Sequence, residues 1–211
     1  MRRFVLQENI RRWEAALAQA DAAENLAILN GVIETSRREL ALLDALENGA
    51  LPPWQRRPVT DDAPLIAAAV AAFRRRYETS PQVAALIDPR PGLVFRDVNP
   101  AWERSGSGRP RREIVGRAFF DMFPDRPNSP SAQGIVVSYE ALRDAAERQE
   151  VICKGVHRYD LPTPQGGLVE RYWRNVVRPL PEAADPLSFL VLEVNDVTDA
   201  VRGGDARAPK S

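Results

Sequence analysis

The spacing of apolar residues divides the chain into a helical part and a strand-rich part. Near the N-terminus they recur at steps of three and four, first at Leu6, Ile10, Trp13 and Leu17, and then at Leu26, Leu29, Ile33, Leu40 and Leu43. This period predicts two amphipathic helices, the second with a heptad-like seam. Asp21 between them is suited to an N-cap, and Asn48-Gly49 predicts a helix end. We therefore expect residues 1–50 to form an antiparallel helical hairpin.

Proline separates this hairpin from the next element. Residues 51–62 contain Pro52, Pro53 and Pro58, which disfavour helix, and they are interpreted as a linker. A lead-in helix is expected within residues 63–82, with Pro64 in its first turn and its end near Tyr77.

From Val83 onward the pattern predicts strands. Short apolar runs at Val83 to Ile87 and Leu93 to Val98 flank a turn, and short helices follow. The remaining segments are a longer helix and three more strands, over Ser131 to Gln149, Val151 to Tyr159, Leu168 to Arg178 and Leu187 to Val194. This order predicts an α+β fold, with a five-stranded antiparallel sheet and short helices on one face.

Five local motifs occur in this second part. They are Ile87-Asp88-Pro89 with Asp97-Val98-Asn99-Pro100-Ala101-Trp102, Glu113-Ile114-Val115-Gly116-Arg117, Phe119 to Asp125, Arg171-Tyr172-Trp173, and Asp196-Val197-Thr198. In this order they resemble the PAS family of bacterial sensory domains. The resemblance covers Val83 to Thr198 and implies a PAS domain over residues 83–199. Gly203-Gly204 and Pro209 indicate a disordered tail over residues 200–211.

Charge and cysteine content limit which classes of partner and which cellular compartment are expected. Equal numbers of basic and acidic residues give a net charge of +0, which argues against a nucleic-acid partner. No apolar stretch reaches the ~20 residues that span a bilayer, and no signal peptide follows Met1, so no membrane partner is expected. The single cysteine, Cys153, permits no intramolecular disulfide. A soluble cytoplasmic protein is predicted.

PAS domains commonly hold small ligands between the sheet and the short helices, so the resemblance implies a pocket. The expected lining is Phe119, Phe120, Phe123, Tyr159 and Trp173. Strand alternation places Cys153, His157 and Tyr159 on one face, with Lys154, Val156 and Arg158 on the other. Cys153 is interpreted as buried. The alternative to a pocket is a solid core.

The candidate chemistry does not point to an enzyme. No acidic pair or metal-ligand spacing supports catalysis, so no catalytic or metal residues are assigned. His157 is the only histidine. It is interpreted as structural rather than as a haem ligand, and no cofactor is required by the sequence.

The favoured hypothesis is a non-enzymatic cytoplasmic regulator. With only Asp199 to Ser211 after the last motif, a signal is expected to leave by association. Homodimerisation is expected, and the resemblance implies a signalling partner such as a histidine kinase. The expected contact residues are Ile10, Trp13, Leu17, Leu26, Leu29, Ile33, Leu40 and Leu43. The alternative is a small-molecule or cofactor sensor. Whether the hairpin dimerises or packs on the rest of the chain is left open.

Overall fold

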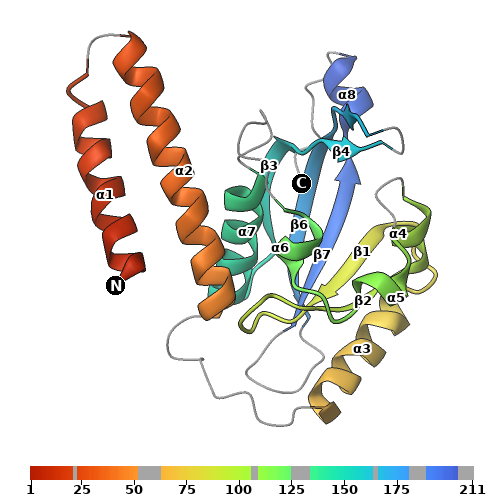
Figure 1. The fold of residues 1–211 in the computed structure, drawn as a ribbon. Coiled ribbons are helices and arrows are strands. Elements are labelled where there is room, and N and C mark those ends of the chain that lie inside the picture. Colours follow the sequence, from red (N-terminus) through yellow and green to blue (C-terminus); the bar gives the residue numbers. More distant parts are fainter. Residues whose placement is uncertain are drawn as a thin grey trace.

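The N-terminal helices form the predicted hairpin. The computed structural model describes residues 1–20, 23–51, 63–105, 109–124, 134–163, 166–180 and 189–203. Helix α1 (Arg2–Leu17) lies antiparallel to α2 (Ala23–Glu47), as Figure 1 shows. Ion pairs join the two helices, with Arg3 Nε 2.7 Å from Asp44 Oδ1 and Arg37 Nη2 2.5 Å from Glu14 Oε1. Asp21 and residues 52–62 of the linker lie outside the described residues.

A five-stranded antiparallel sheet forms the centre of the rest of the molecule, as predicted. Its strands are β1 (Val83–Ile87), β2 (Phe95–Val98), β3 (Ile152–Arg158), β6 (Tyr172–Leu180) and β7 (Phe189–Asp196), in the order β2-β1-β7-β6-β3. A separate two-stranded sheet pairs β4 (Leu161–Pro162) with β5 (Leu168–Val169). The single strand predicted from Leu168 to Arg178 is thus two strands, because the chain leaves the small sheet before it joins the large one.

Helices cover both faces of the large sheet. On one face lie α4 (Pro100–Arg104), α5 (Arg111–Ile114), α6 (Phe119–Met122) and α7 (Gly134–Arg148). On the other face α3 (Ala63–Tyr77) packs on β1, β6 and β7 (Figure 1). Helix α8 (Thr198–Arg202) follows β7, so the segment predicted as a tail begins within a helix. Among the described helices, none has the length and apolarity to cross a membrane.

Alternate residues of the central strands enter two different cores. Ala85 and Ile87 of β1 face the short helices, whereas Ala84 and Leu86 face α3. All four side chains are fully buried. A strand that is buried on both faces gives a continuous apolar run in the sequence, which is why Val83 to Ile87 was predictable as a strand.

Buried polar side chains fix the ends of the strands. The Asn99 side-chain oxygen accepts from the backbone N–H groups of Ala84 and Trp102, at 3.1 Å each, and so caps α4. The Thr198 hydroxyl accepts from the Tyr172 N–H at 2.9 Å, and Asp196 accepts from the Thr198 N–H at 2.9 Å. These contacts give both motifs a structural role, because they satisfy backbone N–H groups at the ends of strands.

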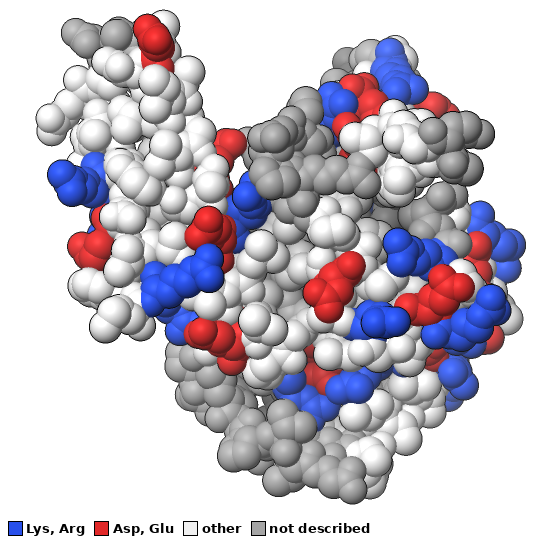
Figure 2. Space-filling model, viewed as in Figure 1, with Lys and Arg blue, Asp and Glu red and all other residues white. Residues whose placement is uncertain are grey.

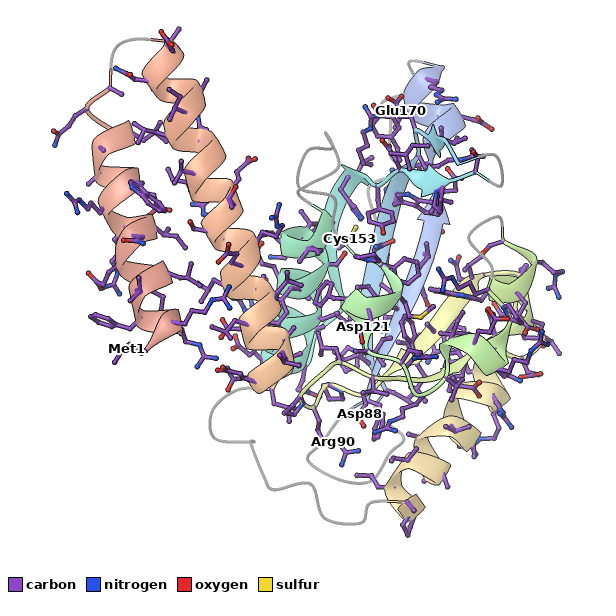
Figure 3. The ribbon with its side chains drawn as sticks, viewed as in Figure 1. Met1, Asp88, Arg90, Asp121, Cys153 and Glu170 are labelled. Carbon is purple, nitrogen blue, oxygen red and sulfur yellow. The ribbon has the colours of Figure 1, made fainter. Side chains whose placement is uncertain are left out.

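The end of α2 is attached to the sheet and its helices. The Ala50 N–H donates to the Pro89 carbonyl at 2.7 Å, and the Gly92 N–H donates to the Ala45 carbonyl at 2.8 Å. The Asp88 carboxylate accepts hydrogen bonds from the side chains of Arg90 and Arg96. Asp88 and Arg90 are labelled at the base of the molecule in Figure 3. Burial raises the pKa of Asp88, but the hydrogen bonds from these two arginines outweigh it and hold the pKa below its ordinary value. The hairpin therefore packs on the rest of the chain through its lower end.

A β-bulge in β3 corrects one expectation. Cys153 pairs with Val176 and Val156 pairs with Arg174, so β3 has one residue more than β6 between these pairs. Gly155, at φ +86°, provides the left-handed conformation there. The extra residue reverses the alternation, so Cys153 does not share a face with His157. The interpretation of Cys153 as buried is wrong, because this thiol is exposed.

Candidate ligand-binding cavity

A cavity of about 60 Å³ lies between the short helices and the sheet. We call it the inner cavity. Residues from α4, α6 and α7 form one side, and residues of β3, β6 and β7 form the other. Its lining consists of Trp102, Phe119, Phe120, Phe123, Gly134, Ile135, Ser138, His157, Tyr159, Leu161, Trp173, Asn175, Leu192 and Val194. The fold thus has a partly open cavity at the place where a solid core was the alternative.

All five residues predicted to line a pocket lie on this wall, and most of them touch one another. The Phe119 ring stands edge-on to Phe120 at 5.0 Å between centroids, and Phe123 lies 6.1 Å from Tyr159. Trp173 is fixed by its indole N–H, which donates to the Tyr159 carbonyl at 2.8 Å. The structure brings these aromatic side chains together, and their role in binding stays a prediction.

Three residues that line the inner cavity each carry a buried polar atom without a hydrogen-bond partner in the described protein. These atoms are Nε1 of Trp102, Nδ1 of His157 and Oδ1 of Asn175. An unpaired buried donor or acceptor costs about 1–3 kcal/mol, so native proteins contain few of them. Of the four such atoms among the described residues, three belong to residues that line this cavity.

Burial also sets the charge of the histidine. Desolvation lowers the pKa of His157 from 6.5 to about 4, so the imidazole is neutral at pH 7. A neutral imidazole has one nitrogen that donates and one that accepts. The described lining contains no carboxylate, lysine or arginine side chain.

Sequence reasoning missed Trp102 and Asn175 as cavity residues. Asn175 lies two positions after Trp173 in β6, so strand alternation alone places both side chains on one face. A polar residue on the inner face of a sheet, between Trp173 and the buried Val177, is the signal that could have identified it. For Trp102 the sequence offered only its place in the motif after Asn99.

The residues predicted as a contact surface lie along the hairpin. Ile10 and Ile33 are buried, and the others are half-buried: Trp13, Leu17, Leu26, Leu29, Leu40 and Leu43. Because α1 packs along α2, this stripe is used to a large extent within the hairpin. The exposed apolar side chains are different ones, namely Met1, Phe4, Val5, Ile28 and Leu46.

A family model describing the PAS fold matches residues 77–202. The chain belongs to the PAS family. The match includes the whole sheet and every residue that lines the inner cavity. The PAS domain is therefore a signalling or sensor-type module, in a family that is generally regulatory rather than enzymatic. No curated protein matches this sequence.

Solved structures similar to the chain include PAS and LOV domains. VqmA from Vibrio cholerae is 18% identical with a TM-score of 0.42, and the match covers 62% of this chain and 51% of VqmA. The LOV domain of the Erythrobacter litoralis EL346 histidine kinase is 18% identical with a TM-score of 0.41, and the match covers 56% of this chain and 98% of the LOV domain. A PAS domain from Colwellia psychrerythraea is 14% identical with a TM-score of 0.44, and the match covers 62% of this chain and 98% of that domain. The chain spans about half the length of VqmA.

These similarities correct the expected partners. VqmA is described as a LuxR-type receptor with a DNA-binding mechanism, and it has been solved in a complex with ligand and DNA. The exclusion of a nucleic-acid partner is therefore wrong. Net charge did not justify it, because it averages over the whole chain, whereas proteins contact DNA through local basic surfaces.

Proposed function

We propose that the chain is a non-enzymatic sensory protein whose PAS domain binds a small molecule in the inner cavity. The observation that carries this proposal is that three residues lining one cavity, Trp102, His157 and Asn175, each carry an unpaired buried polar atom. Ligand sites are typically concave, mostly apolar, and equipped with a few polar groups that fix the orientation of the ligand. A cytoplasmic location stays a prediction.

Native mass spectrometry tests this proposal. The full chain, purified from its own cells without denaturation, is expected to carry one small molecule per chain. That molecule should be lost when Asn175→Leu and His157→Phe are combined. Asn195→Leu is a matched control, because the Asn195 amide donates to the Arg174 carbonyl and does not line the cavity. A chain without any bound molecule, which is also not stabilised by a metabolite extract, would contradict the proposal.

We further propose that the hairpin provides the contact with a second copy of the chain. Phe4 and Leu46 are 66% and 68% exposed, although both are large apolar residues. Arg3 bonds Asp44 and Glu47, so the start of α1 lies beside the end of α2. Figure 2 shows that the upper part of the hairpin stands apart from the rest of the molecule, whereas the start of α1 and the end of α2, which carry Phe4 and Leu46, form its lower end.

Light scattering tests the second proposal. The full chain is expected to be dimeric, and replacing Phe4 and Leu46 together by serine is expected to give monomers. A matched control replaces the exposed Val169 and Leu168 by serine, on the small sheet far from the hairpin in sequence. If the oligomeric state does not change with the hairpin variant, the hairpin is not the dimer interface.

A further inference from the structure

The unpaired polar atoms of three residues that line the inner cavity specify complementary groups on a ligand. The Trp102 indole nitrogen can only donate a hydrogen bond, and the Asn175 side-chain oxygen can only accept one. His157 Nδ1 can take either role in the neutral ring. A ligand that satisfies the first two atoms must therefore carry both an acceptor and a donor.

Among the described residues, the wall of the cavity has no charged side chain that could balance a charge on a ligand. Transfer of an ion into such surroundings without a partner of opposite charge is costly. Lys154 lines a smaller space of about 10 Å³ together with His157 and Asn175. Its ammonium group lies 2.5 Å from Asp144 Oδ2, so its charge is already compensated. An uncharged ligand follows from these surroundings.

The volume limits the ligand to a few atoms. An engineered apolar cavity of about 150 Å³ holds benzene, and one water occupies about 10–15 Å³ on this measure. These two references bracket the capacity of a space of about 60 Å³ at roughly two to six non-hydrogen atoms. Aromatic faces and edges of Phe119, Phe120, Phe123 and Tyr159 form much of the wall, which favours a flat molecule.

We infer that the ligand of the PAS domain is a small, flat, uncharged molecule of the amide or azole class. It accepts a hydrogen bond from Trp102 and donates one to Asn175, while His157 completes the polar side of the site. This inference rests on the proposed function, because it names the chemistry of the molecule that the inner cavity would bind.

Two isosteric pairs of probes test the ligand class. Acetamide and acetate have the same number of non-hydrogen atoms but differ in charge. Pyrazole and furan are both five-membered rings, but only pyrazole has an N–H donor. Each probe is titrated into the full chain while the Trp102 indole N–H resonance is followed by NMR. Comparison with Trp102→Phe assigns this resonance among those of the four tryptophans.

Acetamide and pyrazole are expected to shift the Trp102 resonance to saturation. Acetate and furan are expected to bind at least about tenfold more weakly. The charge of acetate would be uncompensated in the cavity, and furan has no N–H group to donate to Asn175. Asn175→Leu should weaken the binding of acetamide and pyrazole by about tenfold or more, whereas Asn195→Leu should not change it. Circular dichroism confirms that each variant is folded.

Thermal unfolding without any ligand provides a second readout. Asn175→Leu removes an unpaired buried oxygen, so its melting temperature is expected to equal or exceed that of the parent chain. A variant that is more stable but binds less is the combination expected of a ligand-binding residue. A clear loss of stability would show that Asn175 has a structural role instead.

The outcomes separate this inference from the proposed function. If acetate or furan binds as tightly as its partner, the assigned ligand class is wrong, although a small molecule still occupies the cavity. If no probe shifts the resonance, the inference is also overturned. The proposed function is then judged separately, by the molecule that purifies with the chain.

Discussion

His157 lines the inner cavity, and its burial determines its charge. Its Nδ1 is buried and unpaired, and desolvation lowers the pKa of the residue from 6.5 to about 4. The folded protein therefore binds fewer protons than the unfolded chain between these two values. Since stability rises with pH wherever the unfolded state binds more protons, His157 makes the fold sensitive to mild acid.

The first prediction concerns this pH dependence. As pH falls from 6.5 to 4, the free energy of unfolding should decrease by up to about 3 kcal/mol from His157 alone. Urea unfolding at a series of pH values measures it. His157→Phe should flatten the curve in this window. Burial raises the pKa values of Asp88 and Asp144, but hydrogen bonds from their basic partners outweigh it and hold both below 3.8, so these carboxylates titrate at lower pH. An unchanged slope in the variant would assign the pH dependence to other groups.

At the scale of elements, the end of α2 decides how the hairpin joins the PAS domain. Gly49 stands there at φ +65°, and an added Cβ would lie 2.1 Å from the Pro89 carbonyl oxygen. Its own carbonyl accepts from the Tyr139 hydroxyl of α7 at 3.1 Å. Ala41, Ala45 and Ala50 belong to the same core as α7. Small side chains thus allow the helix to approach the domain closely.

The second prediction compares two glycines of this segment. Gly49→Ala should destabilise the protein by about 2 kcal/mol or more, because it combines a positive φ with a backbone clash. Gly31→Ala, within α2 and with nothing within 4 Å of its added Cβ, should instead stabilise it by about 0.5–1 kcal/mol. Chemical denaturation measures both. Equal effects of the two substitutions would mean that the contact between α2 and the Pro89 turn contributes little.

The elements were largely predictable, whereas their contacts were less so. The buried run at Val83 to Ile87 and the stripe through Leu26 and Ile33 follow the periods of strand and helix, which are local properties. The docking of α2 depends on alanines, whose weak hydrophobicity gives little signal. The face of Cys153 depended on a bulge, for which the only local indication was Gly155 within a strand.

The candidate site was predictable in part of its aromatic lining only. Phe119, Phe120, Phe123, Tyr159 and Trp173 were identified through the family resemblance and strand alternation. The sequence did not predict that Trp102 and Asn175 have unpaired polar atoms. Whether a side chain finds a hydrogen-bond partner depends on the tertiary structure around it. No property of either residue type in the sequence distinguishes a paired side chain from an unpaired one.

At the scale of the whole molecule, α7 lies between the inner cavity and the hairpin. Gly134, Ile135 and Ser138 line the cavity, and Ala141 and Ala145 further along α7 belong to the core that includes the end of α2. Figure 1 shows α7 between α2 and the sheet. One helix therefore connects the proposed ligand to the proposed contact surface.

The third prediction follows from this placement. Hydrogen exchange in α7 and in residues 41–51 should slow when the inner cavity is filled, for which acetamide or pyrazole is the probe. A more ordered α7 restricts the opening of the helix that packs on it. Exchange in α3, on the opposite face of the sheet, should not change and is the internal control. Protection limited to the cavity walls would mean that the hairpin does not respond to occupancy.

The bulge in β3 has a consequence for the solubility of the chain. Strands β2 and β3 form the two edges of the sheet, and exposed edges can recruit strands from other molecules into fibrils. Strand β2 has only four residues. In β3 the irregular backbone at Gly155, with the charged Lys154 beside it, interrupts the regular ladder that an added strand would need. Both edges are thus protected against uncontrolled aggregation.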